Sequence, residues 1–173
     1  MRVGVDIDGV VADFHATADA WLREQTGESH PPTRWDWFRQ YTDGAVLWDR
    51  FWDDAVRDKA VLTTCEPIAG AIPALLLLEE LGHEVVFITH RWPEFAADTE
   101  WWLAERGIPF LVAYVADKST VECDFYVDDK PENVVALRTA GKRAVLFGRP
   151  WNTAWDLPRA TSWLAVLAHI AAL

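Results

Sequence analysis

Short runs of apolar residues recur along the chain, each bounded by polar or turn-forming residues. Nearly continuous apolar character is typical of strands that are covered on both faces of a sheet. We therefore predict five β-strands, at Arg2–Ile7, Glu84–Thr89, Phe110–Val115, Asp124–Val127 and Arg143–Phe147.

Helix-like segments alternate with these runs. Most of them end at a glycine, which is a common stop signal, and two of them begin at a proline, which the first turn of a helix tolerates. The predicted helices are Ile72–Leu81, Pro93–Arg106, Pro131–Ala140 and a last helix at Thr161–Leu173. Alternating strands and helices predict right-handed βαβ units. The expected fold is α/β, with a three-layer, Rossmann-like, parallel five-stranded sheet between helices.

Residues 14–66 interrupt this rhythm, because no strand-like run occurs among them. The segment is rich in aromatic residues, including Trp35, Trp37, Phe38, Phe51 and Trp52. We interpret it as a small helical cap inserted after the first strand, so residues 1–13 and 67–173 form the core. Most of its rings are expected to build the apolar core of the insertion, while Trp101, Trp102 and Trp163 lie on core helices, where packing is the default interpretation.

Composition narrows the class of protein. The 173 residues are 51% hydrophobic and 25% charged, which is typical of a globular domain rather than a disordered chain. The formal net charge of −11 disfavours partners such as nucleic-acid polymers and anionic membranes. The two cysteines, Cys65 and Cys123, lie far apart and fit free thiols. Because neither a leader-like segment nor a long apolar run is present, we expect a cytoplasmic protein without a membrane span.

Polar residues follow the predicted strands at the ends where ligands bind in parallel α/β sheets. They are Asp6, Asp8, Thr89, Lys118, Asp128 and Asp129. Carboxylates gathered in a partly dry cleft repel one another, so a divalent cation is the expected compensation. Oxygen ligands favour Mg²⁺ over zinc. The alternative is that these groups cap helices and face solvent, and it is strongest for Asp129, which precedes the helix at Pro131.

These residues, taken with their neighbours, resemble the four motifs of the haloacid-dehalogenase-like (HAD) hydrolases. The first motif is Asp6-Ile7-Asp8-Gly9-Val10-Val11-Ala12-Asp13-Phe14, and Ile88-Thr89, Lys118 and Val127-Asp128-Asp129 follow in order. Within that superfamily the chain is similar to the 5'(3')-deoxyribonucleotidases. The likeness extends to Glu66–Ala71 and Phe147–Asn152, and it is weak within the predicted cap.

The resemblance implies a mechanism. Asp6 would attack phosphorus and form an aspartyl-phosphate. Asp8 would protonate the leaving ester oxygen and then activate water. Thr89 would donate to a phosphoryl oxygen and Lys118 would neutralise charge on the nucleophile. The implied magnesium ligands are Asp6, Asp128 and the backbone carbonyl of Asp8, with Asp129 binding the ion through water or orienting Lys118.

The substrate side is less well matched. The family often has Thr-Ser in the second motif, whereas His90 follows Thr89 here. His90 is therefore a candidate contact by position, and Arg91 and Lys130 are candidates to replace the missing phosphate contact. By the resemblance, Phe14 matches a base-pocket position, and Trp37 and Trp52 match loosely. The other histidines, His15 among them, have no partner at ligand spacing and are interpreted as surface or core residues.

The expected function is thus a magnesium-dependent phosphomonoesterase that hydrolyses (deoxy)nucleoside monophosphates. One alternative is a HAD phosphatase for another small phosphoester, such as a sugar phosphate. Others from a different class are a phospho-receiver domain and a noncatalytic nucleotide-binding domain. Base preference, 5' or 3' ester selectivity and the oligomeric state, including a homodimer, stay open.

Overall fold

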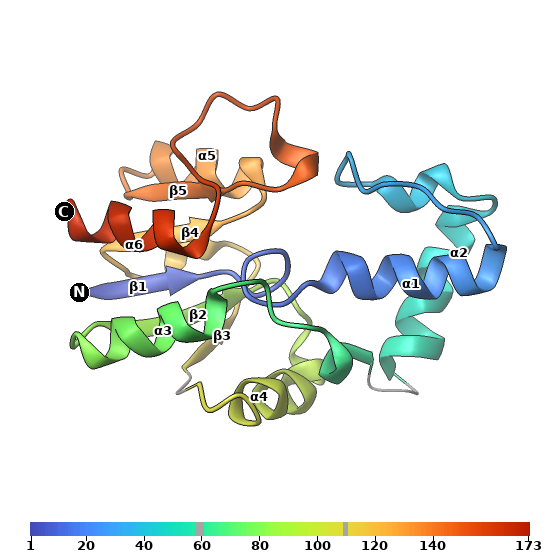
Figure 1. The fold of residues 1–173 in the computed structure, drawn as a ribbon, viewed down its shortest axis with the longest axis horizontal. Coiled ribbons are helices and arrows are strands. Elements are labelled where there is room, and N and C mark those ends of the chain that lie inside the picture. The colour runs from blue at the N-terminus through green and yellow to red at the C-terminus, as the bar shows by residue number, and fades with distance from the viewer. Residues whose placement is uncertain (58–60, 109–110) are drawn as a thin grey trace.

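The computed structural model describes residues 1–57, 61–108 and 111–173. One sheet of six parallel strands runs through the molecule in the order β3-β2-β1-β4-β5-β6 (Figure 1). The strands are β1 (Arg2–Val5), β2 (Glu84–Thr89), β3 (Val112–Tyr114), β4 (Phe125–Asp128), β5 (Ala144–Phe147) and β6 (Arg159–Ala160). The predicted parallel α/β architecture is confirmed. The first strand is central, so the chain builds outward on one side through β3 and then crosses back to β4.

Helices flank the sheet and extend beyond one of its ends. They are α1 (Phe14–Thr26), α2 (Gly44–Arg50), α3 (Ala71–Glu80), α4 (Ala96–Ala104), α5 (Pro131–Thr139) and α6 (Trp163–Ala171). Helices α3 and α6 pack against each other, and α5 packs against β4 and β5. No described helix is long and apolar enough to cross a membrane.

Alternating side chains of the strands enter two separate apolar clusters. Phe87 of β2 packs in one cluster with Leu75 of α3 and Val166 of α6. Its neighbour Val86 packs in the other cluster with Leu137 of α5. Because successive residues of a strand point to opposite faces, both faces of the sheet are covered by helices. This arrangement is the predicted three-layer fold.

The count of five strands was wrong. A sixth strand, Arg159–Ala160, pairs in parallel with Leu146 and Phe147 of β5. It is only two residues long and half polar, so it has no apolar run by which it could be recognised. Its presence delays the last helix, which begins at Trp163 after Ser162, whose side chain accepts a bond from the Ala165 N–H.

Apart from Glu84–Thr89, the other predicted elements also differ from the structure by one or two residues at an end, as two of them illustrate. The helix predicted at Pro93–Arg106 opens with a 3₁₀ turn, η4 (Pro93–Phe95), and continues as α4 only to Ala104. The strand predicted at Phe110–Val115 corresponds to the shorter β3. Phe110, the first residue of the predicted strand, lies outside the described residues. The thiols of Cys65 and Cys123 are free, as expected, but only Cys65 is fully buried.

The insertion after the first strand lies beyond the carboxyl ends of the strands (Figure 1). It consists of α1, the 3₁₀ helix η1 (Trp37–Gln40), α2, the π-helix η2 (Phe51–Arg57) and the 3₁₀ helix η3 (Val61–Thr64). None of its described residues belongs to a named strand. Its position brings the aromatic residues to the edge of the sheet where the polar motif residues lie.

Candidate active site

Three carboxylates meet where β1 and β4 end. Asp6 follows β1, Asp128 is the last residue of β4 and Asp129 follows it, and one oxygen of each lies within 4.8 Å of the others. All three are buried, with Asp129 fully so. Burial raises the pKa of Asp6 to about 7, although Lys118 opposes the effect. Burial also raises the pKa of Asp129 well above its ordinary value, and the neighbouring carboxylates add to the rise.

Lys118 partly compensates this charge. Its Nζ lies 2.8 Å from Asp6 Oδ1 and 2.6 Å from Asp128 Oδ2. The residue opens the short 3₁₀ helix η5 (Lys118–Thr120), and its side chain is only 4% exposed. Burial alone would lower the pKa of Lys118, but Asp128 and Asp6 outweigh it and the pKa is raised. Among the described residues one ammonium faces three carboxyl groups, so full ionisation of the cluster would leave an excess of negative charge.

A divalent cation fits the donor set that these carboxylates present. Asp129 Oδ1 is buried and has no hydrogen-bond partner among the described residues. A buried, unpartnered carboxylate oxygen is costly unless a ligand satisfies it. Asp128 is already held through Lys118, the Lys130 N–H at 2.8 Å and Asn133 Nδ2 at 3.1 Å, which fixes its direction. Hard oxygen ligands of this kind suit Mg²⁺.

A tight loop after β1 places Asp8 beside Asp6. The N–H groups of Val11 and Ala12 both donate to the Ile7 carbonyl at 2.9 Å, so the chain turns as it leaves the strand. Gly9 has φ +83°, a conformation that side-chain-bearing residues rarely adopt. A Cβ there would lie 2.3 Å from Asp129 Oδ2. Glycine is therefore required both by the turn and by the acidic cluster.

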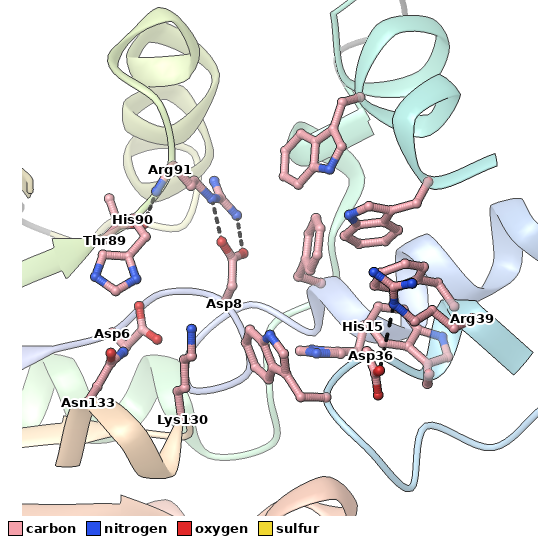
Figure 2. Close-up of a pocket in the computed structure, with 16 residues that line it drawn as sticks. Asp6, Asp8, His15, Asp36, Arg39, Thr89, His90, Arg91, Lys130 and Asn133 are labelled. Carbon is pink, nitrogen blue, oxygen red and sulfur yellow. Dashed lines mark hydrogen bonds and ion pairs between the residues drawn. The ribbon is translucent and has the colours of Figure 1, made fainter. Parts of the chain in front are cut away.

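The Arg91 guanidinium forms a bidentate ion pair with the Asp8 carboxylate. Nε donates to Oδ2 at 2.9 Å and Nη2 to Oδ1 at 2.6 Å (Figure 2). Nη1 donates to Thr99 Oγ1 at 3.0 Å. The Arg91 N–H donates to Thr89 Oγ1 at 3.0 Å. The Thr89 hydroxyl therefore accepts from the protein and keeps its own hydrogen for a ligand. Arg91 thus orients two of the predicted catalytic side chains.

A cavity of about 510 Å³ opens between these groups and the insertion (Figure 2). Polar residues from the strand ends lie on one side of it, and the insertion contributes mainly aromatic rings on the other, together with Asp36 and Arg39 (Figure 2). It is lined by Asp6, Asp8, Phe14, His15, Trp35, Asp36, Trp37, Phe38, Arg39, Trp48, Trp52, Thr89, His90, Arg91, Lys130 and Asn133. One end can therefore hold an anion and the other a flat apolar group.

The structure brings the predicted site residues together in two groups. Those in the cavity wall are Asp6, Asp8, Thr89, Phe14, Trp37, Trp52, His90, Arg91 and Lys130. Lys118, Asp128 and Asp129 lie behind Asp6 and are not part of the wall. Asp129 bonds to Trp151 rather than to Lys118, whose partners are Asp6 and Asp128. Partial desolvation lowers the pKa of His90, although the residue is exposed.

Trp52 connects the insertion to the core. Its ring stacks on Phe14 within the insertion, with centroids 5.7 Å apart, and on Phe95 of η4 in the core at 6.0 Å. On the other side of the cavity, Lys130 Nζ lies 5.2 Å from the ring centroid of Trp35. Aromatic and cation–π contacts therefore join the two regions at both margins of the cavity.

His15, interpreted from the sequence as a surface or core residue, is buried at the wall of the cavity. It is 2% exposed, lines the cavity and stacks on Trp151 with ring centroids 3.8 Å apart. Burial lowers its pKa to about 3, so the imidazole is neutral. In the sequence, only its position directly after Phe14 could have placed His15 at the cavity. That inference would have required the direction of α1, which the sequence does not give.

Further cavity residues lay outside the predicted set, including Trp35, Phe38, Trp48 and Asn133. Asn133 lies in the first turn of α5, five residues after Asp128 at the end of β4, and its side chain donates back to Asp128. The aromatic residues had no comparable signal, because rings in the wall and rings in the insertion core share the same composition. Among the core tryptophans, Trp102 and Trp163 are buried as expected, whereas Trp101 is 50% exposed and the packing interpretation was wrong for it.

Sequence comparisons agree with this geometry. The family described as "5' nucleotidase, deoxy (Pyrimidine), cytosolic type C protein" matches residues 1–172. A Chlorobaculum tepidum protein named "Putative 5'(3')-deoxyribonucleotidase" is 31% identical over 181 residues, covering 98% of this chain and 90% of that protein.

Solved structures show the same fold at lower identity. A haloacid dehalogenase-like family hydrolase from Streptococcus pneumoniae superposes with a TM-score of 0.63 at 12% identity, covering 98% of this chain and 97% of that one. A HAD-superfamily hydrolase from Geobacter sulfurreducens also gives a TM-score of 0.63, at 16% identity, with 98% and 95% covered. The HAD-type fold predicted from the motifs is confirmed.

Proposed function

Because the chain belongs to the family of deoxy (pyrimidine) 5' nucleotidases of cytosolic type C, we propose that it hydrolyses deoxynucleoside monophosphates to nucleoside and phosphate. The observation that carries the proposal is one cavity with two unlike walls. Asp6, Asp8 and Thr89 form the wall suited to a phosphate, and aromatic rings of the insertion form the wall suited to a base. The family's description also supports a cytoplasmic location.

In the first step, Asp6 attacks phosphorus. Its Oδ1 accepts bonds from the Ile7 N–H at 2.8 Å and from Lys118, so Oδ2 is the oxygen that forms the bond. The ester P–O bond breaks as Asp8 delivers its proton to the leaving oxygen, which releases the nucleoside. The Thr89 hydroxyl and Lys118 stabilise the negative charge on the transferring group.

In the second step, Asp8 acts as a base. Its carboxylate takes a proton from water, the water oxygen attacks phosphorus and the bond between phosphorus and Asp6 breaks. Phosphate leaves and Asp6 is restored. The fork of Arg91 holds both oxygens of Asp8 in the free protein. We propose that, when the substrate binds, one of these two guanidinium N–H groups donates to a phosphoryl oxygen instead of to Asp8.

Asp6, Asp128 and Asp129, with the backbone carbonyl of Asp8, are the residues that would hold Mg²⁺. When bound, the ion would offset the negative charge of the carboxylates and the phosphate. The unpartnered Oδ1 of Asp129 and the excess of carboxylates over ammonium groups support its presence.

The nucleobase is proposed to lie against the aromatic wall. Base–aromatic stacking contributes roughly 1 to 3 kcal/mol per base and tolerates different bases. Phe14, Trp37 and Trp52 all line the cavity, which supports their predicted contact with the base. We further propose that residues 14–66 act as a cap over the core formed by residues 1–13 and 67–173.

A substrate screen tests this function. Phosphate release is measured with Mg²⁺ for 5'- and 3'-deoxynucleoside monophosphates and for a matched set of sugar phosphates. We expect turnover of nucleotides that stops with EDTA and in Asp6→Asn. Turnover of sugar phosphates with none of nucleotides would overturn the substrate class. Multiple turnovers of an aryl phosphate would exclude a phospho-receiver or a noncatalytic binding domain.

A further inference from the structure

The loop that follows β5 contacts the acidic cluster from behind. Its 3₁₀ helix η6 (Pro150–Asn152) carries Trp151, whose Nε1 donates to Asp129 Oδ2 at 3.0 Å. Asn152 Nδ2 donates to the Asp129 backbone carbonyl at 2.7 Å. Trp151 is 8% exposed and Asn152 is fully buried. The side chain and the backbone of Asp129 are thus both held by neighbouring residues of one loop.

These bonds decide which oxygen of Asp129 is available. Oδ2 accepts the bond from the indole, and Oδ1 is buried without a hydrogen-bond partner in the part of the chain that the structure describes. An oxygen of Asp129 also lies within 4.8 Å of oxygens of Asp6 and Asp128. An indole N–H can only donate, so it favours the charged form of the carboxylate. The indole nitrogen is not itself a ligand for a cation. The hydrogen bond therefore selects one oxygen and one orientation for ligation.

The indole is itself held in place. Its ring stacks on His15 with centroids 3.8 Å apart and an interplanar angle of 26°. The Arg149 guanidinium carbon lies 4.9 Å from the same ring centroid, and Arg149 also pairs with Asp13 at 2.9 Å. Asn152 Oδ1 accepts a bond from the Arg149 N–H at 3.0 Å. The support reaches from the start of α1 through the indole to Asp129.

We infer that Trp151 is a positioning residue for the cation site, and that its N–H turns Asp129 so that Oδ1 meets the bound ion. This inference rests on the proposed function, because it concerns the Mg²⁺ that the proposed reaction uses. Outer-shell hydrogen bonds to metal ligands typically contribute 10- to 100-fold to metal affinity or activity. The role requires the N–H specifically, and not only the bulk of the ring.

The test measures binding of Mn²⁺ alone to the full chain, by electron paramagnetic resonance, with Mg²⁺ as competitor and no substrate. Trp151→Phe keeps an aromatic ring beside His15 but removes the N–H, and we expect about 10-fold or more weaker binding. Trp155→Phe is the matched control, because Trp155 lies in the same loop and is 42% exposed. It should bind as the wild type does.

Two further variants isolate the hydrogen bond. Replacement of Trp151 by 3-benzothienylalanine, which has the shape of tryptophan without the N–H, should reproduce the loss even where Trp151→Phe does not fold. In an Asp129→Asn background, Trp151→Phe should cause little additional loss, since the bond acts through the carboxylate.

Binding within twofold of the wild type in the benzothienylalanine variant would overturn the inference. A full additional loss in the Asp129→Asn background would also overturn it. Nucleotide hydrolysis by the wild type is measured in parallel. If the wild type hydrolyses nucleotides and the Trp151 variants bind Mn²⁺ normally, only the positioning role fails and the proposed function stands.

Discussion

The strand-end cluster and the aromatic insertion meet at one cavity but are built differently. In the cluster, charged groups are buried and oriented by short contacts, such as Lys118 to Asp6 and Asp128. In the insertion, rings pack on rings, as where Phe38 stacks on Trp48 with centroids 4.6 Å apart. Hydrogen bonds and ion pairs fix directions, whereas apolar packing fixes mainly volume. We therefore expect the cluster to govern the chemical step and the insertion to govern substrate affinity.

The largest effect should come from the nucleophile. Asp6→Asn removes the oxygen that attacks phosphorus while keeping the side-chain shape, so kcat should fall by more than about 10⁴-fold. Steady-state kinetics with a deoxynucleoside monophosphate measure it. Asp53→Asn is the matched control, because the Asp53 side chain lies in the insertion and is 73% exposed. Substantial activity in Asp6→Asn would break the assignment of chemistry to the cluster.

Thr89 should show the next largest effect. Thr89→Val preserves the volume of this 1% exposed residue but removes the hydroxyl donor. We expect a loss of about 10²-fold in kcat/KM, in the range for a single donor to transition-state charge. Thr89→Ser keeps the hydroxyl and should retain most of the activity. Equal losses in the two variants would show that the methyl group matters instead of the hydrogen bond.

Trp52 tests the other half of the comparison. Trp52→Leu should raise KM for nucleotides by about 10-fold, the effect of roughly 1.4 kcal/mol of lost stacking, while kcat changes little. Hydrolysis of acetyl phosphate, which has no ring, should be unaffected. Trp101→Leu, at a 50% exposed position on α4, is the control. A fall in kcat alone would mean that the insertion acts in the chemical step.

His15 should give the smallest effect, in stability rather than activity. Burial lowers its pKa from 6.5 to about 3, so below pH 6.5 the unfolded chain binds a proton that the folded chain does not. Stability that is fully present above pH 6.5 is therefore lost as the pH falls from 6.5 towards 3. Between pH 6.5 and 5.5 the loss should be on the order of 1 kcal/mol relative to His15→Phe. Urea unfolding at both pH values measures it, and parallel pH profiles of the two proteins would contradict it.

The sequence was most informative where the backbone alone positions a side chain. A residue that ends an apolar run in a parallel sheet lies at the carboxyl edge, so Asp6, Thr89 and Asp128 could be brought together without coordinates. Lys118, which follows the third predicted strand, could be placed at the same edge. The two-residue strand β6 could not be found in this way, because its pairing depends on the position of β5 and not on its own pattern.

The insertion was less predictable because its contacts depend on how α1 and the following loop are aimed. His15 and Trp35 come from separate segments and meet with ring centroids 5.2 Å apart, which no local spacing encodes. Trp151 had no signal beyond its place in the stretch Phe147–Asn152. Its bond to Asp129 joins residues 22 positions apart in sequence and could be seen only once the loop was placed.

The most direct test of the account is to trap the reaction intermediate. Asp8→Asn removes both the acid of the first step and the base of the second, so the substrate is acetyl phosphate, whose leaving group needs no protonation. An enzyme phosphorylated on Asp6 should accumulate when this variant is mixed with acetyl phosphate and Mg²⁺. Acid quenching, proteolysis and mass spectrometry then locate the modification. We predict one added phosphoryl group on the peptide that contains Asp6, absent when Asp6→Asn is combined with Asp8→Asn. Phosphorylation at another residue, or undiminished phosphorylation in the double variant, would contradict the account.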